Sequence, residues 1–328
     1  MSGSVSEDYG GVGGDMGFDS ITVYEQSKTG DSSWGYGIQS IVIHYLNEYG
    51  TNEQKSEWLP KLIEGKSIAS LAMTEPGAGS DLQAIKTTAK KDGDEWIING
   101  SKMWITNGSL ADVALVWAKD EDGIVRGFLL EKGMEGFTSN DIHGKLSLRA
   151  SVTSELSMVN VRVPDSSRLP DIEGLKGPLS CLTQARYGIA WGMVGAAVDC
   201  YQTALDYSLE RKQFSKPIAG YQLTQSKFAE MITQITMAQL TVYQLGRLKD
   251  QNKMRFDQVS LAKRNHCKMA RDVARTCREI LGGNGIMEDY SPMRHMTNIE
   301  TVFTYEGTHE MHSLILGQSV TGIAAYDS

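Results

Sequence analysis

The chain has 328 residues, of which 41% are hydrophobic and 22% charged, and its formal net charge is −8 at pH 7. This length predicts two or three domains, and the composition is ordinary for a globular protein with a sizeable core. The acidic total makes the chain a poor general binder of nucleic acid. No apolar run reaches the roughly 20 residues that cross a bilayer, so we expect no membrane partner. The first residues lack the basic start and apolar stretch of a signal peptide.

Cysteine and histidine patterns give no sign of a disulfide framework or a metal centre. The sequence contains four cysteines, which are Cys181, Cys200, Cys267 and Cys277. None forms a CxxC pair, so a reducing compartment fits best. His309 and His312 flank a glutamate but lack the i, i+4 spacing of a zinc protease helix, and no third ligand is nearby. We therefore predict no metal site.

The N-terminal part of the sequence predicts two helices. Residues 1–35 are rich in Gly and Ser, with one short mixed segment between the Gly-rich stretches. Tyr36–Tyr49 and Glu53–Glu64 are typical of helices, with Gly50 ending the first and Thr51 starting the second. This is little helix for an independent domain, so residues 1–67 are predicted to be a partial N-terminal helical domain.

Residues 68–170 are predicted to form a β domain. Glu95–Ile98 is followed by Asn99-Gly100, a strong turn signal. Val113–Trp117 is an apolar run, and a second run, Gly127–Glu131, follows an acidic turn. Ser154–Val163 alternates with a period near two, as in a half-buried strand. Several short strands with regular turns indicate a β-barrel or sandwich.

Residues 171–328 are predicted to form a C-terminal four-helix bundle. Long helical stretches at Leu179–Leu209, Gln222–Lys249 and Asp257–Leu281 are followed by a shorter one at Gly307–Thr321. Apolar residues of the second stretch recur on one helical face; they are Phe228, Met231, Ile232, Ile235 and Val242. The overall class is α+β, in the order helices, β domain, helical bundle.

Two Gly-rich stretches remain open to more than one interpretation. The sequence has no Walker A motif and no GxGxxG after a strand. Thr74–Asp81 is either a turn or a loop whose backbone N–H groups approach an anion or an aromatic ring. Gly282–Gly285 more often marks a helix C-cap than a ligand site.

Three charged residues also have two possible roles each. Glu306 is either a solvated carboxylate at a helix N-terminus or a base whose pKa is raised by burial, and composition alone favours the first. Arg186, in an apolar stretch, either pairs with a carboxylate or faces a ligand. Arg211 ends a helix, where a cation is favoured and a phosphate contact is equally possible.

Five motifs in order give the chain a specific resemblance. They are Met73–Asp81, Trp104–Asn107, Arg211–Phe214, Leu281–Gly285 and Tyr305–Thr308. With them the chain resembles the acyl-CoA dehydrogenase family from about Glu7 to Gly322. Within that family it is most similar to the glutaryl-CoA dehydrogenases, on four further segments, Ser147–Ser151, Ala185–Gly192, Leu245–Gln251 and Thr304–His309.

The resemblance implies an FAD site between the β domain and the C-terminal bundle. The residues implied at the flavin ring are Leu71, Ala72, Met73, Thr74, Glu75, Pro76, Gly77, Ala78, Gly79, Ser80, Trp104, Ile105 and Thr106. Those implied at the adenosine half, across a subunit contact, are Arg211, Phe214, Gln222, Glu279, Ile280, Leu281, Gly282 and Gly283, with Thr308 completing the site. A homotetramer is implied in the same way.

The resemblance also implies the substrate residues and the chemistry. The residues implied at the acyl-CoA are Ser80, Leu182, Thr183, Gln184, Ala185, Arg186, Tyr187, Gly188, Ile189, Tyr305 and Gly307. Glu306 is implied to take the α-proton while hydride leaves the β-carbon for flavin N5. The implied acceptor of the electrons is an electron-transfer flavoprotein. The implied compartment is a mitochondrial matrix or a bacterial cytoplasm, in fatty acid or amino acid catabolism.

Two departures from the family pattern bear on these expectations. The helical N-terminal domain is expected to be shorter than in the family by several tens of residues. Glutaryl-CoA dehydrogenases carry an Arg after an Asp-Ser-Gly-aromatic sequence, whereas this chain has Asp31-Ser-Ser-Trp34-Gly35 without an Arg. Since a buried substrate carboxylate needs a cation, a monocarboxylic acyl-CoA is at least as well supported as glutaryl-CoA with decarboxylation. An acyl-CoA oxidase and a catalytically silent acyl-CoA-binding scaffold are the alternatives.

Overall fold

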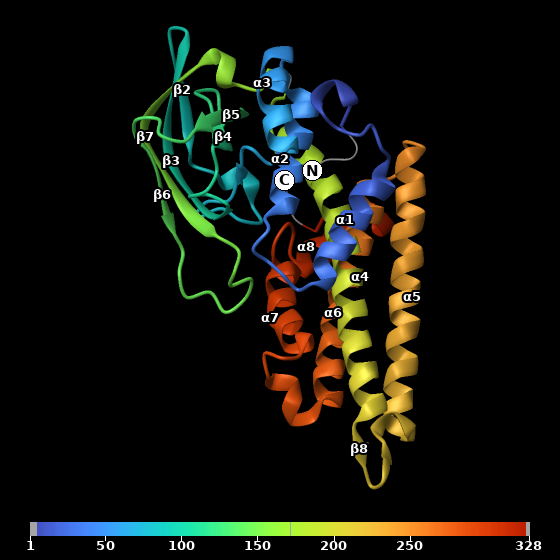
Figure 1. The fold of residues 1–328 in the computed structure, drawn as a ribbon. Helices are drawn as coiled ribbons and strands as arrows, with labels where there is room; N and C mark the ends of the chain where they lie inside the picture. The colour runs from blue at the N-terminus through green and yellow to red at the C-terminus, as the bar shows by residue number, and fades with distance from the viewer. Residues whose placement is uncertain (1–4, 171, 326–328) are drawn as a thin grey trace. The chain divides into compact units, whose positions relative to one another are not determined.

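The computed structural model describes residues 5–170 and 172–325, which form two compact units (Figure 1). The first unit comprises the chain up to Asp15 together with Ser32–Lys145 and Arg149–Ala185. The second comprises Met16–Asp31, Leu146–Leu148 and the chain from Arg186 on. Each unit has its own apolar core, and each is described by itself below.

Two helices of the first unit, α2 (Tyr36–Tyr49) and α3 (Asn52–Ile63), confirm the prediction for this segment. Thr51 begins α3 with a capping box. Its hydroxyl accepts from the Gln54 backbone N–H at 3.1 Å, and the Gln54 side chain accepts from the Thr51 N–H at 3.0 Å. α2 packs against the first strand of the sheet, so the apolar faces of these helices cover part of its core.

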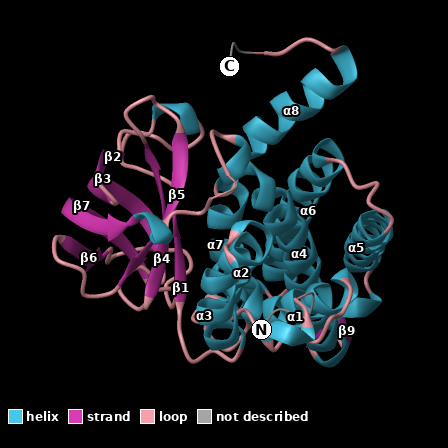
Figure 2. Cartoon of the chain, turned by 90° about the horizontal axis from the view of Figure 1, so that it is seen from above, coloured by secondary structure: helices cyan, strands magenta, loops and turns pink. Residues whose placement is uncertain are grey.

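In the described residues of the first unit, seven strands form one sheet in the order β1-β4-β2-β3-β7-β6, with β5 paired to β4. Their bounds are β1 Ala69–Ala72, β2 Thr88–Asp92, β3 Glu95–Thr106, β4 Val113–Lys119, β5 Val125–Glu131, β6 Phe137–Asp141 and β7 Thr153–Pro164. β1 and β2 run parallel to β4, and the other pairs are antiparallel. Figure 2 shows these strands together.

The sheet curls around an apolar core of its own. β3 and β5 are not hydrogen-bonded neighbours, yet Trp96 and Phe128 meet edge to face with ring centroids 5.4 Å apart. β4 is buried along nearly its whole length, as its unbroken apolar sequence predicts. β7 alternates between buried and exposed residues, as a half-buried strand does. The predicted α+β class with a β middle domain is confirmed.

The prediction of a turn at Asn99-Gly100 is wrong. The β2–β3 hairpin turns earlier, because Asp92 pairs with Glu95. Asn99 and Gly100 lie inside β3, where the pairing with β7 shifts register. Gly100 has φ +150°, and a Cβ there would come within 2.6 Å of the Thr87 hydroxyl. The dipeptide therefore serves a bulge with close backbone approach instead of a turn.

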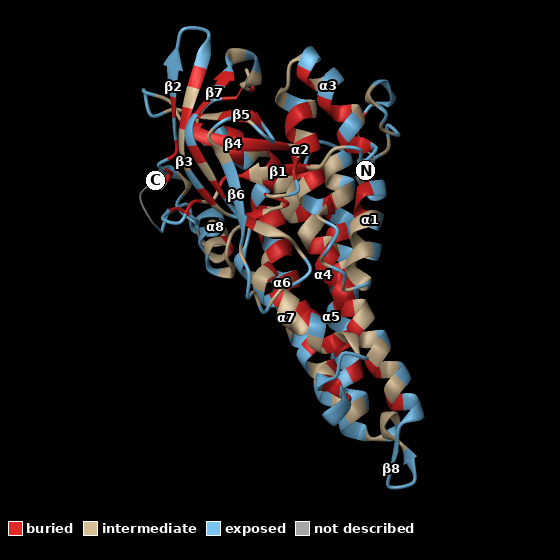
Figure 3. Ribbon diagram, turned by 60° about the vertical axis from the view of Figure 1, so that its left-hand side comes forward, coloured by how far each residue is buried: buried red, intermediate tan, exposed pale blue. Residues whose placement is uncertain are grey.

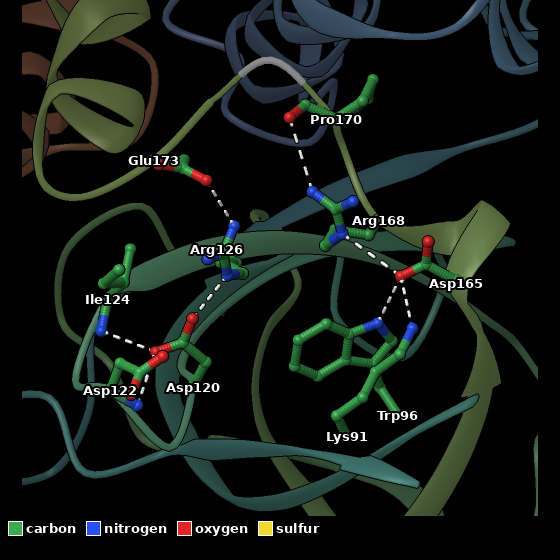
Figure 4. Close-up of polar contacts among 10 residues, drawn as sticks. All are labelled: Lys91, Trp96, Asp120, Asp122, Ile124, Arg126, Asp165, Arg168, Pro170 and Glu173. Atoms are coloured by element: carbon green, nitrogen blue, oxygen red, sulfur yellow. Dashed lines mark hydrogen bonds and ion pairs between the residues drawn. The ribbon is translucent and has the colours of Figure 1, made fainter. Parts of the chain in front are cut away.

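Two groups of polar side chains lie near the ends of strands in the sheet (Figure 4). Asp165, just after β7, accepts from the Trp96 indole at 2.7 Å and from Lys91 at 2.9 Å. These hydrogen bonds hold the pKa of Asp165 well below its usual range. In the same view Arg126 donates to Asp120 at 2.6 Å and to Glu173 at 2.8 Å. Such contacts satisfy polar groups near the ends of the strands.

The second unit is helical. Its helices are α1 Met16–Lys28, α4 Lys176–Glu210, α5 Gln222–Asp250, α6 Phe256–Ile280, α7 Ser291–Thr304 and α8 His309–Thr321. The part of α4 that belongs to this unit begins at Arg186. Four of them match predicted stretches, while α1 and α7 were not predicted. A short hairpin, β8 Lys212–Gln213 and β9 Lys216–Pro217, joins α4 to α5. Of the predicted α5 stripe, Phe228, Met231, Ile235 and Val242 are buried but Ile232 is 43% exposed.

Glycines of α4 explain why α1 forms although its sequence is mixed. A Cβ at Gly195 would lie 2.3 Å from the Tyr24 carbonyl oxygen, and one at Gly192 would lie 2.8 Å from the Ser27 hydroxyl. The two helix backbones therefore approach closely at these glycines. Tertiary packing, not a strong helical period, stabilises α1.

We expect Gly100→Ala to lower the free energy of unfolding by about 2 kcal/mol or more, because the new Cβ meets Thr87 and the backbone is strained. The matched control is Gly37→Ala in α2, where a Cβ has open space and no positive φ. The control should be neutral or stabilising by up to about 1 kcal/mol. Unfolding followed by circular dichroism measures both; equal stability of the two variants would contradict the bulge.

Candidate active site

The Glu306 loop, Tyr305–Thr308, connects α7 to α8 in the second unit and has an unusual backbone. Glu306 has φ +52° and Gly307 has φ +90°. The left-handed conformation costs a non-glycine residue roughly 1–2 kcal/mol. Such strain persists where the surroundings hold it in place, and it is concentrated at functional sites.

Two cations from other helices hold this loop. Arg186 Nε of α4 donates to the Glu306 carbonyl oxygen at 2.9 Å. Lys263 Nζ of α6 donates to the Tyr305 carbonyl at 2.6 Å and to the Gly307 carbonyl at 2.7 Å. Three consecutive carbonyls thus each accept from a positively charged group, and such bonds are stronger than neutral ones.

The Glu306 carboxyl group is desolvated but not hydrogen-bonded at one oxygen. Within the described residues, its Oε2 is buried and has no hydrogen-bond partner. Burial raises the pKa of Glu306, while the positive charges of Arg186 and Lys263 oppose the rise. A carboxylate with a raised pKa and a free oxygen is suited to accept a proton from a bound molecule.

His312 of α8 packs against the loop at Gly307. Its side chain is fully buried, and among described groups neither ring nitrogen has a hydrogen bond. Burial, with the charges of Lys263 and Arg186, lowers the pKa of His312 to about 3, so the ring stays neutral. A Cβ at Gly307 would lie 2.8 Å from His312 Nε2. Position 307 therefore requires glycine for space as well as for its φ.

Thr308 ends the loop by capping α8. Its hydroxyl accepts from the Met311 backbone N–H at 3.2 Å. His309 then stacks on Phe303 of α7, with ring centroids 4.5 Å apart and an interplanar angle of 11°. The loop is thus fixed to the helix on each side.

A second group of predicted residues lies in the first unit, in the Thr74–Ser80 loop. Glu75 and Ala78 exchange two backbone hydrogen bonds, at 3.0 and 3.1 Å, which makes a tight turn. The Glu75 carboxylate is buried and accepts from Lys102 at 2.9 Å and from the Thr87 hydroxyl at 2.6 Å. Lys102 also donates to the Met73 carbonyl at 3.1 Å. Burial lowers the pKa of Lys102 to about 8, against the opposing effect of Glu75.

Trp104 of β3, in the first unit, has an exposed side chain and an unusual backbone conformation. It has φ +64° at a second register shift of β3, and 55% of its surface is exposed. The Met103 backbone N–H donates to the Thr74 carbonyl at 2.9 Å, which ties β3 to the loop. Gly77 and Gly79 have open space where a Cβ would be. An exposed aromatic ring beside small residues can stack on a planar ligand.

A third group lies at one end of the second unit, at the β8–β9 hairpin and the turn η5 (Gly282–Ile286). Phe214 is 91% exposed at the hairpin, with φ +47°. Figure 3 shows the hairpin exposed at the tip of this unit. Glu279, at the end of α6, pairs with Lys227 of α5 at 3.2 Å. Arg211, Gln222 and Gly283 belong to the same end.

The Glu306 loop and this third group lie toward opposite ends of α6. Lys263, which holds the loop, and Glu279 are 16 positions apart in the helix. At 1.5 Å per residue they are separated by about 24 Å along the axis. The two groups are therefore separate surfaces of the second unit.

Several predicted site residues are buried in the cores. They are Ala72, Met73, Glu75, Ala78, Ile105, Leu182, Tyr187 and Leu281. The Tyr187 hydroxyl donates to the Val242 carbonyl at 3.2 Å and accepts from the Trp191 indole at 2.9 Å. Any ligand contact of these residues must come from the backbone or from a small exposed part of the side chain.

Sequence reasoning missed Lys263 and His312. A signal for Lys263 exists, since it lies on the buried stripe of α6 four residues after Val259 and three before His266. A lysine on an apolar stripe indicates a buried cation with a specific partner. His312 was weighed only as a metal ligand. In the described chain, no group of three His, Cys, Asp or Glu side chains could hold a metal ion.

A hollow of about 300 Å³ in the second unit contains none of the predicted site residues and is lined by Tyr24, Trp191, Thr236, Gln239, Leu240 and Tyr243. None of the described helices is both long enough and apolar enough for a membrane span.

Comparison with known proteins identifies the family. Three family models match: Acyl-CoA dehydrogenase, N-terminal domain (residues 1–66), middle domain (70–161) and C-terminal domain (173–321). The chain belongs to the acyl-CoA dehydrogenase family, which consists of flavin-dependent oxidoreductases. The predicted resemblance is confirmed.

Individual relatives differ in their substrates. The long-chain specific acyl-CoA dehydrogenase of Sus scrofa mitochondria is 35% identical over 325 residues, covering 97% of this chain and 76% of the relative. A glutaryl-CoA dehydrogenase from Mycobacterium smegmatis in complex with FADH2 is 46% identical, with a TM-score of 0.96, covering 100% of this chain and 85% of that one. A chain from a structure of the electron transferring flavoprotein of Acidaminococcus fermentans is 33% identical, with a TM-score of 0.92, covering 97% and 86%.

We expect Lys102→Met to lower the free energy of unfolding by about 3–5 kcal/mol, because it leaves the Glu75 carboxylate buried without its cation. Adding Glu75→Gln should restore much of the loss. The control is Lys91→Met, which removes a half-exposed ion pair with Asp165 and should cost under about 1 kcal/mol. Denaturant unfolding measures all three; a small loss for Lys102→Met would show that the pair does not hold the loop.

Proposed function

We propose that this protein is an FAD-dependent acyl-CoA dehydrogenase that oxidises the Cα–Cβ bond of a short-chain acyl-CoA, with Glu306 as the base. The observation that carries the proposal is the Glu306 carboxyl group, with one buried oxygen unpaired among the described residues, on strained backbone held by two cations. A structural carboxylate would be hydrogen-bonded or solvated instead.

We propose that the Thr74–Ser80 loop, with Leu71–Met73 and Trp104–Thr106, binds the flavin ring. The exposed Trp104 and the open space over Gly77 and Gly79 fit a planar ring with polar edges. The Glu75–Lys102 pair would keep the loop rigid from within. The flavin, when bound, supplies the hydride acceptor for the β-hydrogen.

We propose that the adenosine half of FAD is bound by the third group, which comprises Arg211, Phe214, Gln222 and Glu279–Gly283. We also propose that Thr308, in the Glu306 loop, completes the site. The distance of about 24 Å along α6 supports a contribution from a neighbouring subunit, because the Glu306 loop lies toward the other end of the helix. The proposed assembly is a homotetramer.

The residues in and around the Glu306 loop have different roles in the proposed removal of the α-proton. Glu306 accepts the α-proton at its unpaired oxygen. Desolvation raises the pKa of Glu306 and so strengthens the carboxylate as a base, while the charges of Arg186 and Lys263 oppose the rise. We propose that the Glu306 backbone N–H donates to the thioester oxygen and stabilises the enolate that develops there. Tyr305, Gly307 and the segment Leu182–Ile189 would orient the acyl-CoA.

The segment around Trp34 lacks the Arg of glutaryl-CoA dehydrogenases, which supports a monocarboxylic substrate at least as well as glutaryl-CoA. Trp34 lies where glutaryl-CoA dehydrogenases have a motif that ends in Arg, and its ring packs on Tyr36 with centroids 4.9 Å apart. An aromatic pair offers no compensation for a buried carboxylate. We propose an electron-transfer flavoprotein as the electron acceptor, and a mitochondrial matrix or bacterial cytoplasm as the compartment.

The proposal is tested by anaerobic mixing of the purified protein with butyryl-CoA, glutaryl-CoA and a long-chain acyl-CoA. We expect the flavin absorbance to be bleached by butyryl-CoA. Bleaching by glutaryl-CoA alone would contradict the proposed substrate class, and no bleaching with FAD bound would favour a silent acyl-CoA binder. Rapid reoxidation in air would favour an oxidase.

We expect Glu306→Gln to bind FAD normally but to reduce it at least about 100-fold more slowly, because an amide cannot accept the proton. Glu310→Gln, an exposed glutamate four residues away, is the matched control and should behave like wild type. Stopped-flow absorbance at the flavin band measures both. An unchanged rate in Glu306→Gln would refute the base assignment.

A further inference from the structure

Lys263 of α6 is buried and reaches the backbone on both sides of Glu306. We propose that Lys263 is a positioning residue for the base: its ammonium group donates to the carbonyls on both sides of Glu306 and so fixes the backbone that carries the Glu306 carboxyl group. The proposal rests on the proposed function of Glu306.

The geometry of the contact is specific to the loop conformation. The carbonyls of Tyr305 and Gly307 both point at one nitrogen atom, at 2.6 and 2.7 Å. Carbonyls on either side of a residue converge in this way only when the chain turns sharply between them. The positive φ values of Glu306 and Gly307 make that turn. Lys263 therefore contacts the groups that define the strained conformation.

The position of Lys263 in the fold makes it a rigid support. It is 1% exposed, on the stripe of α6 that faces the core. α6 packs against both α7 and α8, the helices that flank the loop. A side chain anchored there holds the loop relative to both of its ends.

Lys263 is a charged side chain in a buried place, where removing it from water is unfavourable. Within the described chain, Lys263 makes no ion pair with a carboxylate and donates to backbone carbonyls instead. Burial lowers its pKa, with the negative charge of Glu306 opposing. An apolar residue at this position would leave the Tyr305 and Gly307 carbonyls without these donors. The positive charge of Lys263 in addition opposes the rise of the Glu306 pKa.

The pH dependence expected of the Glu306 carboxyl group depends on the other titratable groups around it. They are Arg186 from α4, Cys267 from α6, His309 and His312 from α8, and Tyr305 in the loop itself. Burial raises the pKa of Cys267 to about 11 and lowers that of His312 to about 3, so both are neutral near pH 7. Lys263 and Arg186 are the two charges that lower the pKa of Glu306.

The experiment compares Lys263→Met, which removes the charge and the donors, with Lys263→Gln, which keeps a donor without the charge. The control is Lys268→Met, on the same helix but in an exposed pair with Asp272. Flavin reduction by saturating acyl-CoA is measured from pH 5 to 9 in each full-length holoprotein, together with FAD content and the melting temperature.

Loss of a positive charge favours the protonated carboxyl, so the pKa of Glu306 should rise. We expect the acid limb of the rate profile to move to higher pH by about one unit in both Lys263 variants, with a roughly tenfold lower rate at acid pH. At high pH, Lys263→Gln should recover more of the maximal rate than Lys263→Met. Lys268→Met should match wild type in every readout.

Infrared difference spectra of the same holoproteins titrate the Glu306 carboxyl directly, with Glu306→Gln identifying its band. A higher titration midpoint in the Lys263 variants supports the proposal, even if no acyl-CoA reduces the wild-type flavin and the proposed function fails. An unchanged acid limb and an unchanged carboxyl midpoint in Lys263→Gln would overturn it. Lys263→Gln alone carries the test if Lys263→Met does not fold.

Discussion

A carboxyl group that removes a proton from carbon has to be both desolvated and ionised, and these requirements oppose each other. In this protein both requirements apply to Glu306, which has one buried carboxyl oxygen, while Arg186 and Lys263 supply positive charge nearby. The cations do not neutralise the base by pairing with it, because they bind the carbonyls of its own loop. One carboxyl oxygen is thereby left for a substrate, which is the feature on which the proposed chemistry depends.

The rest of the helical unit maintains that arrangement. The left-handed backbone at Glu306 is unfavourable by itself, and hydrogen bonds from Arg186 of α4 and Lys263 of α6 hold it. Gly307 leaves room for the neutral ring of His312, and Thr308 starts α8 at once. The proposed flavin loop of the first unit follows a similar rule, since the buried Glu75–Lys102 pair stiffens a turn made of small residues. In both places a buried lysine donates to carbonyl groups of a loop, but only Lys263 does so beside the proposed catalytic base.

Local sequence signals were sufficient where structure is decided locally. The cap at Thr51, the apolar run of β4 and the alternation of β7 are properties of neighbouring residues, and the corresponding elements were predicted correctly. Asn99-Gly100 was misinterpreted because a dipeptide suited to a turn is equally suited to a bulge. α1 was missed because glycines of a distant helix stabilise it. Glu306 was found only through a family motif, while Lys263 acts across 42 positions of sequence that no local pattern spans.

The most direct test of the account is a kinetic isotope effect on flavin reduction, with butyryl-CoA deuterated at the α-carbon as the substrate. If Glu306 removes the α-proton as the flavin is reduced, the deuterated substrate should reduce the flavin several-fold more slowly than the unlabelled one. The same measurement on Glu306→Gln links this step to the residue, because removal of the α-proton should then be at least about 100-fold slower. A Glu306→Gln variant that reduces its flavin at the wild-type rate with the same isotope effect would contradict the central role assigned to the Glu306 loop.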